Sequence, residues 1–372
     1  MNFSYWERKT WLTDIDFAII GSGIVGLTCA LTLREKHPKA NIVVLERGIL
    51  PSGASTKNAG FACFGSISEI LEDLTHHSEA EVIQLVEARV DGLKRLRSFV
   101  GDATLDYQEH GGYELFSEKD SELYSECSSK IPYVNQLLKP IFGTDVFSEK
   151  KNGFGFGNIH SNLIYNRFEG QIDTGKMMFG LLQKASEANI KILNSVEITG
   201  ISKGNESAIL STNSSEEISA KNVFVATNGF AKQFLSLDVA PARAQVLITK
   251  PIANLPLEGT FHLDKGYYYF RNIHDRVLFG GGRNLDFKTE ETTQMGLTEL
   301  VQDQLEEVLR TTILPNTPFE IDMRWSGIMG VGQQKKPIVK EVMPRVYCGV
   351  RLGGMGVAIG STIGKELAHL ID

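Results

Sequence analysis

One segment near the start of the chain, residues 16–46, constrains the fold more than any other. An apolar stretch runs into Gly21-x-Gly23-x-x-Gly26, a helical pattern follows, and a second apolar stretch ends at Glu46. This order predicts a strand–helix–strand unit that binds an adenine dinucleotide, with its phosphates at the positive end of the helix. Glu46 stands where a carboxylate can accept hydrogen bonds from ribose hydroxyls. The unit alone does not distinguish a nicotinamide from a flavin dinucleotide.

Composition narrows the class of protein and its partners. The chain has 372 residues, 42% hydrophobic and 22% charged, with a net charge of −7. These values predict a soluble globular protein with two domains. The negative charge and the lack of a basic run argue against nucleic acid as a partner. No apolar run approaches the 18 or so residues of a membrane span, so we expect no membrane insertion and a cytoplasmic location. The sequence carries no signal for the number of subunits.

The four cysteines are far apart and lack the spacing of metal ligands. We therefore expect buried free thiols and no metal site. Periodicity predicts helices over 67–100, 173–188, 295–311 and 356–371, and an antiparallel sheet over 241–285. Short strands are expected at 190–193, 195–202, 208–212 and 223–227. Residues 104–165 are expected to be irregular, with short strands and glycine turns.

Nine short motifs follow one another in an order known from one family. They are S-Y-W-E at 4–7, G-S-G-I-V-G at 21–26, L-E-R at 45–47, G-A-S-T-K-N-A-G at 53–60, A-T-N-G at 226–229, P-A-R-A-Q-V at 241–246, Y-Y-Y-F-R with D-R-V-L-F-G-G-G at 267–282, R-W-S-G with K-P-I-V at 324–339, and G-G-M-G-V at 353–357. The chain thus resembles the FAD-dependent amino-acid and amine oxidoreductases, which include D-amino-acid oxidase, glycine oxidase and sarcosine oxidase. Its motifs look most like those of the γ-glutamylputrescine oxidoreductase branch.

The resemblance implies an α/β fold with two domains and noncovalent FAD. The expected Rossmann-like FAD-binding domain is assembled from discontinuous segments, 1–80, 155–235 and 328–372. The expected α+β substrate domain has a large antiparallel sheet and comprises 81–154 and 236–327. No cysteine falls where some relatives attach the flavin covalently.

The expected cofactor-binding residues come from six parts of the chain. The dinucleotide unit supplies Gly21, Ser22, Gly23, Ile24, Val25, Gly26, Glu46 and Arg47. In the family, the loop after this unit lies along the flavin. The resemblance implies the same role for the matching residues here, Ser55, Thr56, Asn58, Ala59, Gly60 and Phe61. A position whose backbone holds the adenine matches Val196, although a valine there could equally be core. Ala226, Thr227 and Gly229 end a strand of the dinucleotide domain, where ligands of such sheets bind. The remaining expected residues are Gly327, Arg351, Gly353, Gly354, Met355, Gly356 and Val357.

The C-terminal glycines have two interpretations. A helix N-terminus beside Gly353, Gly354 and Gly356 would stabilise negative charge on the reduced flavin. The glycines at 356, 360 and 364 could instead serve close helix packing, and both interpretations are expected to hold for different glycines.

The expected substrate residues are Tyr267, Tyr269 and Arg271, which alternate along one strand and so share a face. An arginine fork suits a carboxylate, although Arg271 could form a structural ion pair instead. Arg351 and Arg324 are alternative carboxylate partners. Glycine-oxidase-like relatives carry an arginine after the W-x-G tryptophan, but residues 325–329 contain none. This difference argues against a simple glycine or D-amino-acid substrate.

The resemblance implies that a small-molecule amine or amino acid loses a hydride to flavin N5 and becomes an imine. No catalytic base is assigned. Relatives of the sarcosine oxidase type place a lysine beside the flavin, and the matching strand at 277–280 lacks one. A dehydrogenase therefore stays open beside an oxidase. The residues also leave open a nicotinamide-dependent dehydrogenase, a tRNA aminomethyl-uridine-modifying flavoenzyme and a flavin-binding protein without turnover.

Overall fold

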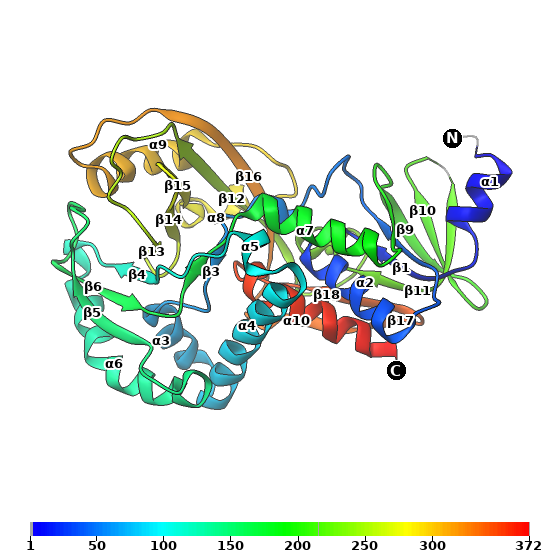
Figure 1. Cartoon of the computed structure of the whole chain (residues 1–372), viewed down its shortest axis with the longest axis horizontal. Coiled ribbons are helices and arrows are strands. Elements are labelled where there is room, and N and C mark those ends of the chain that lie inside the picture. The colour runs from blue at the N-terminus through cyan, green and yellow to red at the C-terminus, as the bar shows by residue number, and fades with distance from the viewer. Residues whose placement is uncertain (1–2, 215, 372) are drawn as a thin grey trace.

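The computed structural model describes residues 3–214 and 216–371. The molecule is elongated and contains two large sheets, one toward each end of its long axis (Figure 1). The N- and C-terminal ends both lie at the end that carries the first sheet. The sequence-based expectation of an α/β fold, with a Rossmann-like unit beside a large antiparallel sheet, is confirmed.

The first sheet has eight strands and contains the predicted dinucleotide unit. Its central strand β1 pairs in parallel with β2 and with β11, and β11 pairs in parallel with β18. Strand β2 and the C-terminal parts of β1 and β11 are apolar and buried because the sheet is covered on both faces. The strands are β1 (Ile15–Ile20), β2 (Ile42–Leu45), β8 (Lys191–Leu193), β9 (Ile198–Lys203), β10 (Ala208–Thr212), β11 (Glu217–Val225), β17 (Ile338–Met343) and β18 (Val346–Val350).

Four helices cover one face of this sheet: α2 (Ile24–Lys36), α4 (Glu79–Val100), α7 (Thr174–Glu187) and α10 (Gly356–Ala368). Phe17 and Ile19 of β1 point into this layer, whereas Ile15 and Ile20 pack with β9 and β10 on the opposite face. Helices α2 and α10 lie close together, because a Cβ at Gly364 would stand 2.1 Å from Oγ1 of Thr28.

The second sheet also has eight strands, in the order β16-β12-β15-β14-β13-β4-β6-β5, and its pairs are antiparallel except that of β13 with β4. Phe261, Phe270 and Phe279 form an aromatic core on one face, which α9 (Glu299–Val308) covers. The rings of Phe261 and Phe270 stack, and Phe279 meets Phe270 edge to face. Part of the other face, including Val246 and Leu278, packs against Ala59, which lies in the loop after β2 of the first sheet. The strands are β4 (Gly112–Leu115), β5 (Phe147–Lys151), β6 (Asn162–Asn166), β12 (Ala240–Thr249), β13 (Thr260–Leu263), β14 (Tyr268–Ile273), β15 (Arg276–Gly281) and β16 (Ile321–Val331).

The remaining elements are short apart from two helices, α3 and α6, that pack beside β5 and β6. They are α1 (Tyr5–Glu7), α3 (Ile67–His76), α5 (Asp102–Leu105), α6 (Ser121–Phe142), α8 (Phe287–Glu290), β3 (Phe61–Ala62) and β7 (Gly170–Gln171). Within the described residues, none of the helices combines the length and the apolar character needed to cross a membrane.

Two sequence-based expectations about elements are wrong. Residues 104–165 are not mainly irregular, because they contain the 22-residue helix α6, which tolerates Pro132 and Pro140. Burial of its apolar face, including Val134 and Leu138, outweighs the loss of the proline hydrogen bonds. The helix predicted over 67–100 is two helices, because Ser78 interrupts it and caps α4.

The predicted domain boundaries stay a prediction, and two elements lie across them. Strand β6 falls within the predicted FAD-binding segments, but it pairs with β4 and β5 in the second sheet. Helix α4 falls within the predicted substrate domain, but it packs on α10, where a Cβ at Gly92 would stand 2.1 Å from the carbonyl oxygen of Ala358. The terminal boundaries at residues 1–2 and 372 lie outside the described residues.

Candidate functional site

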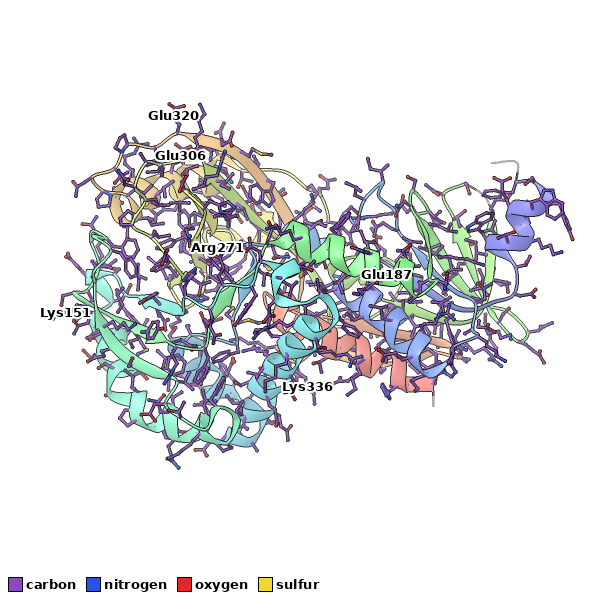
Figure 2. The ribbon with its side chains drawn as sticks, in the orientation of Figure 1. Lys151, Glu187, Arg271, Glu306, Glu320 and Lys336 are labelled. Atoms are coloured by element: carbon purple, nitrogen blue, oxygen red, sulfur yellow. The ribbon has the colours of Figure 1, made fainter. Side chains whose placement is uncertain are left out.

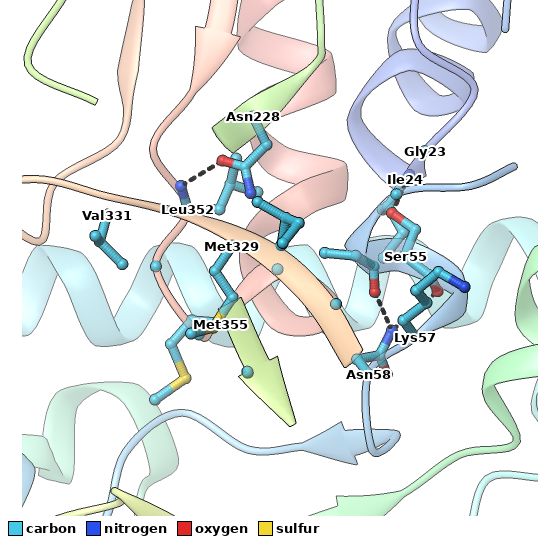
Figure 3. Close-up of a pocket in the computed structure, with 18 of the residues that line it drawn as sticks. Gly23, Ile24, Ser55, Lys57, Asn58, Asn228, Met329, Val331, Leu352 and Met355 are labelled. Atoms are coloured by element: carbon cyan, nitrogen blue, oxygen red, sulfur yellow. Dashed lines mark hydrogen bonds between the residues drawn. The ribbon is translucent and has the colours of Figure 1, made fainter. Parts of the chain in front are cut away.

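A single cavity of about 420 Å³ joins the two sheets. Segments far apart in the sequence line it: the β1–α2 turn, the loop 52–61, the end of β11, strands β12 to β15, and the turn before α10. Figure 3 shows part of it, with Ile24 and Ser55 facing Met355 and Leu352 across the opening. The predicted dinucleotide unit and the glycine-rich C-terminal turn therefore share one cavity.

The nucleotide end of the cavity is built around Glu46. Gly21 adopts a φ of 102°, and a Cβ at Gly26 would stand 1.9 Å from the Gly21 carbonyl oxygen, so both positions require glycine. The backbone N and Oγ of Ser22 donate to Oε2 of Glu46 at 3.2 and 2.7 Å. Ser52 Oγ donates to the other carboxylate oxygen at 2.9 Å. Glu46 is thus held in a fixed orientation at the cavity wall.

The loop 53–60 is tied to the N-terminus of α2. The backbone N of Ile24, the first residue of α2, donates to Oγ of Ser55 at 3.0 Å (Figure 3). Nδ2 of Asn58 donates to the Ser55 carbonyl oxygen at 2.9 Å, and its Oδ1 accepts from the Gly60 backbone N at 2.8 Å. Ser55 therefore lies where a phosphate at the helix terminus would be held, and Asn58 orders the loop.

The opposite wall has the features of a cradle for a planar polar ligand. A Cβ at Gly353, Gly354 or Gly356 would meet no atom within 4 Å. Helix α10 begins at Gly356 without a side-chain cap, so its first N–H groups open onto the cavity. Thr227 also lines the cavity, and its buried Oγ1 has no hydrogen-bond partner among the described residues. Open space and an unpartnered hydroxyl fit a cofactor such as FAD at this wall.

The structure brings most of the predicted site residues to this cavity. Those that line it are Gly21, Gly23, Ile24, Val25, Glu46, Arg47, Ser55, Asn58, Ala59, Phe61, Val196, Ala226, Thr227, Tyr267, Tyr269, Gly327, Gly353, Gly354, Met355, Gly356 and Val357. Those that lie behind its wall are Ser22, Gly26, Thr56, Gly60, Gly229, Arg271 and Arg351. Gly229 serves packing, since a Cβ there would stand 2.3 Å from the Met329 carbonyl oxygen.

Arg271, which the sequence predicts to bind a substrate carboxylate, has other partners in the structure. It is only 5% exposed and does not line the cavity, and Figure 2 shows it in the half of the molecule that carries the second sheet. Its Nε donates to the Ala59 carbonyl oxygen at 2.5 Å, and its Nη2 donates to that of Ile172 at 2.9 Å. Burial lowers its pKa to about 10. Arg271 therefore anchors the loop 53–60, and its role as a ligand of a substrate carboxylate stays a prediction.

The two alternative arginines are also committed elsewhere. Arg351 donates from Nη1 to Asp238 Oδ2 at 2.6 Å and from Nε to the Lys336 carbonyl oxygen at 2.9 Å. Arg324 binds Gln302 at 2.6 Å and forms an ion pair with Glu306. Neither lines the cavity, and their role as carboxylate ligands stays a prediction.

The second-sheet end of the cavity carries charged side chains that sequence reasoning missed. They are Glu69, Glu72, His262, Lys265 and Arg283. Arg283 follows Gly280–Gly282 at the end of β15, stacks on the Phe287 ring at 4.7 Å, and has no ion-pair partner among the described residues. Its place directly after a run of glycines was an available signal. His262 lies within an ordinary strand pattern and gave none.

Tyr267 and Tyr269 reach the cavity from the start of β14. Tyr267 is 37% exposed, whereas burial raises the pKa of Tyr269 to about 12. The Tyr269 ring lies over Gly280 of the neighbouring strand, where a Cβ would stand 2.7 Å from the ring. The Tyr269 phenol is therefore a neutral hydrogen-bonding group near neutral pH.

A Rossmann-like unit whose nucleotide cavity continues beneath a large antiparallel sheet defines a dinucleotide-dependent redox protein. The model of the FAD dependent oxidoreductase family matches residues 16–370, and the chain belongs to this family. It is an FAD-dependent oxidoreductase of the amino-acid and amine oxidase type.

Relatives of known sequence and structure agree with this family. The chain is 22% identical over 389 residues to a protein of Haemophilus influenzae named probable oxidoreductase OrdL, covering 97% of this chain and 84% of that protein. Glycine oxidase from Geobacillus kaustophilus has a similar structure, with a TM-score of 0.76 at 18% identity over 96% of this chain and 94% of that chain. Iminodiacetate oxidase from a Chelativorans species gives a TM-score of 0.74 at 18% identity, covering 95% of each chain.

Proposed function

We propose that this protein oxidises the C–N bond of a small amine or amino acid to an imine, with FAD as the hydride acceptor. The flavin, when bound, supplies the electron-accepting chemistry at its N5 atom. The protein residues hold the cofactor, orient the substrate and exclude water. The observation that carries the proposal is the single cavity, since it joins two helix N-termini to a charged pocket on the second sheet.

The residues of the first unit would hold the two ends of the cofactor. Glu46 lies where it can accept hydrogen bonds from ribose hydroxyls, and the backbone of Val196 adjoins it, donating to the Glu46 carbonyl oxygen at 2.9 Å. The N-terminus of α2 lines the cavity and would hold the phosphates. The N-terminus of α10 and the open space at Gly353 and Gly354 would receive the flavin and favour its negative charge on reduction.

We propose that the cofactor is bound noncovalently. Cys63 is the cysteine that lines the cavity in the described part of the chain. Burial raises the pKa of its thiol well above the ordinary value, so it is not the thiolate that a covalent bond would need. Acid precipitation should release the flavin into the supernatant. Flavin that stays in the pellet would contradict noncovalent binding.

Tyr267, Tyr269 and Arg283 are the proposed groups for orienting the substrate. Arg283 lines the cavity, and although Glu290 and Glu291 lie near enough to favour its charge, Glu290 is bound by Arg243, so Arg283 takes the role first expected of Arg271. Glu69 and Glu72 on α3 offer negative charge to an ammonium group. The pocket thus presents both signs of charge, which suits a substrate that carries an amine and a carboxylate.

Two spectroscopic measurements test the proposal. The purified protein should show the absorption bands of oxidised flavin, and these should bleach without oxygen when amino acids, secondary amines or γ-glutamylated amines are added. A colourless protein that binds a nicotinamide dinucleotide would support a nicotinamide-dependent dehydrogenase. Flavin that no amine bleaches, together with salt-sensitive tRNA binding, would support a tRNA-modifying flavoenzyme. The rate at which air restores the colour separates an oxidase from a dehydrogenase.

A further inference from the structure

A histidine–glutamate pair lies at the second-sheet end of the cavity. His262 on β13 lines the cavity, and its Nε2 lies 3.1 Å from Oε2 of Glu169. Both side chains are buried, with 7% and 1% of their surface exposed. Among the hydrogen bonds of the described residues, none engages Nδ1 of His262. This second ring nitrogen is therefore available to a molecule in the cavity.

Glu169 is fixed in its orientation toward His262. Its Oε2 also accepts a hydrogen bond from Thr260 Oγ1 at 3.1 Å, and its Oε1 accepts one from Asn166 Nδ2 at 3.3 Å. The carboxylate occupies the space beside Gly112, where a Cβ would stand 1.9 Å from Oε2. Glu169 itself does not line the cavity, so it acts on a ligand only through His262.

The groups around His262 are mainly negative. Glu114 of β4 is its neighbour across the sheet, Glu69 faces it from α3, and Glu169 binds it directly. Tyr269 of β14 is its partner on the other side, and the Cys63 sulfur lies within 4.8 Å of the pair. The positive groups nearby are Lys265, in the turn after β13, and Arg89 of α4, which donates to the Phe64 carbonyl oxygen. Arg283 and Lys335 also line the cavity, and Lys335 forms ion pairs with Glu72 and Asp73. The charges that act most strongly on His262 are nevertheless the carboxylates of Glu169, Glu69 and Glu114, which favour its protonated form.

Burial opposes the charge on His262, but the carboxylates, above all Glu169, outweigh it and raise its pKa to about 9. A substrate ammonium has a pKa near that of lysine, about 10.4. Transfer of its proton to a histidine with this pKa is therefore close to balanced. The Tyr269 phenol is protonated across this range and cannot accept the proton. Glu69 already accepts a hydrogen bond at the N-terminus of α3, where the Ser66 backbone N donates at 2.9 Å.

We propose that the Glu169–His262 pair accepts the proton of the substrate ammonium group and so delivers the neutral amine that hydride removal requires. In this step an N–H bond of the ammonium breaks, its electron pair stays on nitrogen, and the proton binds Nδ1 of neutral His262. Glu169 then stabilises the imidazolium. The inference rests on the proposed function and adds that the substrate enters as a cationic amine.

The pH dependence of anaerobic flavin bleaching tests the pair. In the native protein, the second-order rate constant for an amine should rise with pH, with an inflection near 9, and fall again above about 10, where the free substrate ammonium loses its proton. His262→Asn should lower it by about 100-fold and remove this inflection. Glu169→Gln should move the inflection about two units lower, toward the ordinary histidine pKa of about 6.5. The control His274→Asn alters an exposed histidine in a turn with φ of 50°, which asparagine adopts readily, and should change nothing. An unchanged inflection in Glu169→Gln would contradict the proposal.

A second pair of measurements does not depend on turnover. NMR titration of histidine-labelled holoprotein, with the signal assigned from its loss in His262→Asn or from its shift in Glu169→Gln, should give a pKa near 9. A value at or below 6.5 would overturn the proposal even if one variant fails to fold. tert-Butylamine has no C–H bond to oxidise, and its binding at pH 8, followed by calorimetry in two buffers, should release about one proton. Equal release by His262→Asn would overturn the proposal.

These outcomes separate the inference from the proposed function. If no amine bleaches the flavin, the proposed function itself is contradicted. Bleaching by amines with the same pH profile in the native protein and in His262→Asn would remove only the role of the pair.

Discussion

Two arginines of the second sheet, Arg271 on β14 and Arg283 in the turn after β15, lie in different environments, although the sequence drew attention only to Arg271. Arg271 donates hydrogen bonds to backbone carbonyl oxygens, whereas Arg283 lines the cavity. The difference lies in the tertiary environment, because Arg271 meets the loop 53–60 that crosses its strand. A residue pattern along one strand cannot show which face another segment will cover.

Matched variants at these two positions should separate binding from stability. Arg283→Gln should raise KM for amines that carry a carboxylate by at least about tenfold, since it removes a charged hydrogen bond. The free energy of unfolding of this variant should stay within about 0.5 kcal/mol of that of the native protein. Arg271→Gln should lower the free energy of unfolding by about 3 kcal/mol, because two buried carbonyl oxygens lose a charged donor. Steady-state kinetics and urea unfolding measure the two effects. A large rise in KM from Arg271→Gln without loss of stability would reverse the assignment.

Two buried acid–base groups should make the stability of the protein fall as pH rises. Burial raises the pKa of Glu114 from 4.5 to about 7, against the hydrogen bonds that Ser68 donates to it. The pKa of His262 is raised from 6.5 to about 9. In both cases the folded state binds the proton more tightly than the unfolded state does. Each group therefore contributes its full stabilisation below its pKa in the unfolded chain, and this stabilisation is lost as the pH rises through its pKa in the folded protein.

The expected loss is about 3 kcal/mol from Glu114 between pH 4.5 and 7, and a similar amount from His262 between pH 6.5 and 9. Glu114→Gln should remove the first part of this slope and leave the second. Urea unfolding of both proteins at pH 5, 7 and 9 measures the difference. If the native protein and the variant lose the same stability between pH 5 and 7, Glu114 does not titrate as stated.

At the scale of elements, the site depends on where two helices begin. Helices α2 and α10 lie side by side on the first sheet, and both present their N-termini to the cavity (Figure 1). The glycines of the C-terminal segment divide into two groups, as the sequence suggested. Gly353, Gly354 and Gly356 adjoin open space, whereas Gly360 and Gly364 touch α2.

Substitutions in these two groups of glycines should have different effects, one on FAD binding and the other on stability. Gly354→Leu would fill the open space, so it should weaken FAD binding at least tenfold and change the free energy of unfolding of the apoprotein by less than about 0.5 kcal/mol. Gly364→Ala would drive a Cβ into Thr28 and the α2 backbone, and should lower that free energy by about 2 kcal/mol or more. Flavin fluorescence titration and urea unfolding measure the two quantities. Equal FAD affinity in Gly354→Leu and the native protein would place the cofactor elsewhere.

The sequence specified elements best where local pattern and packing agree. The β1–α2–β2 unit was predictable because its turn is set locally, by the positive φ of Gly21 and by the close approach of Gly26 to the Gly21 carbonyl oxygen. Helix α6 was not, since Pro132 and its serines disfavour a helix locally and only burial against β5 and β6 secures it. His262 was missed for a similar reason. Its partner Glu169 is 93 residues away, and nothing in either local pattern indicates that they meet.

At the scale of the molecule, the cavity wall is shared by both sheets, so the cofactor should act as a bridge between them. Free FAD at 1,000 times its dissociation constant should raise the free energy of unfolding by about 4 kcal/mol relative to the apoprotein. The nicotinamide dinucleotide NAD is the matched control, because it shares the adenine half but lacks the flavin. Thermal or urea unfolding measures the gain. Equal stabilisation by NAD would show that the flavin half makes no contact with the wall.

One wall of this cavity comes from residues 21–60 and the opposite wall from residues 353–357. On a ribosome, the first wall emerges long before the second has been made. FAD binding therefore cannot assist the early stages of folding. A nascent chain that is arrested while its final strand is being made should bind no flavin and remain colourless, whatever the concentration of FAD in the cell.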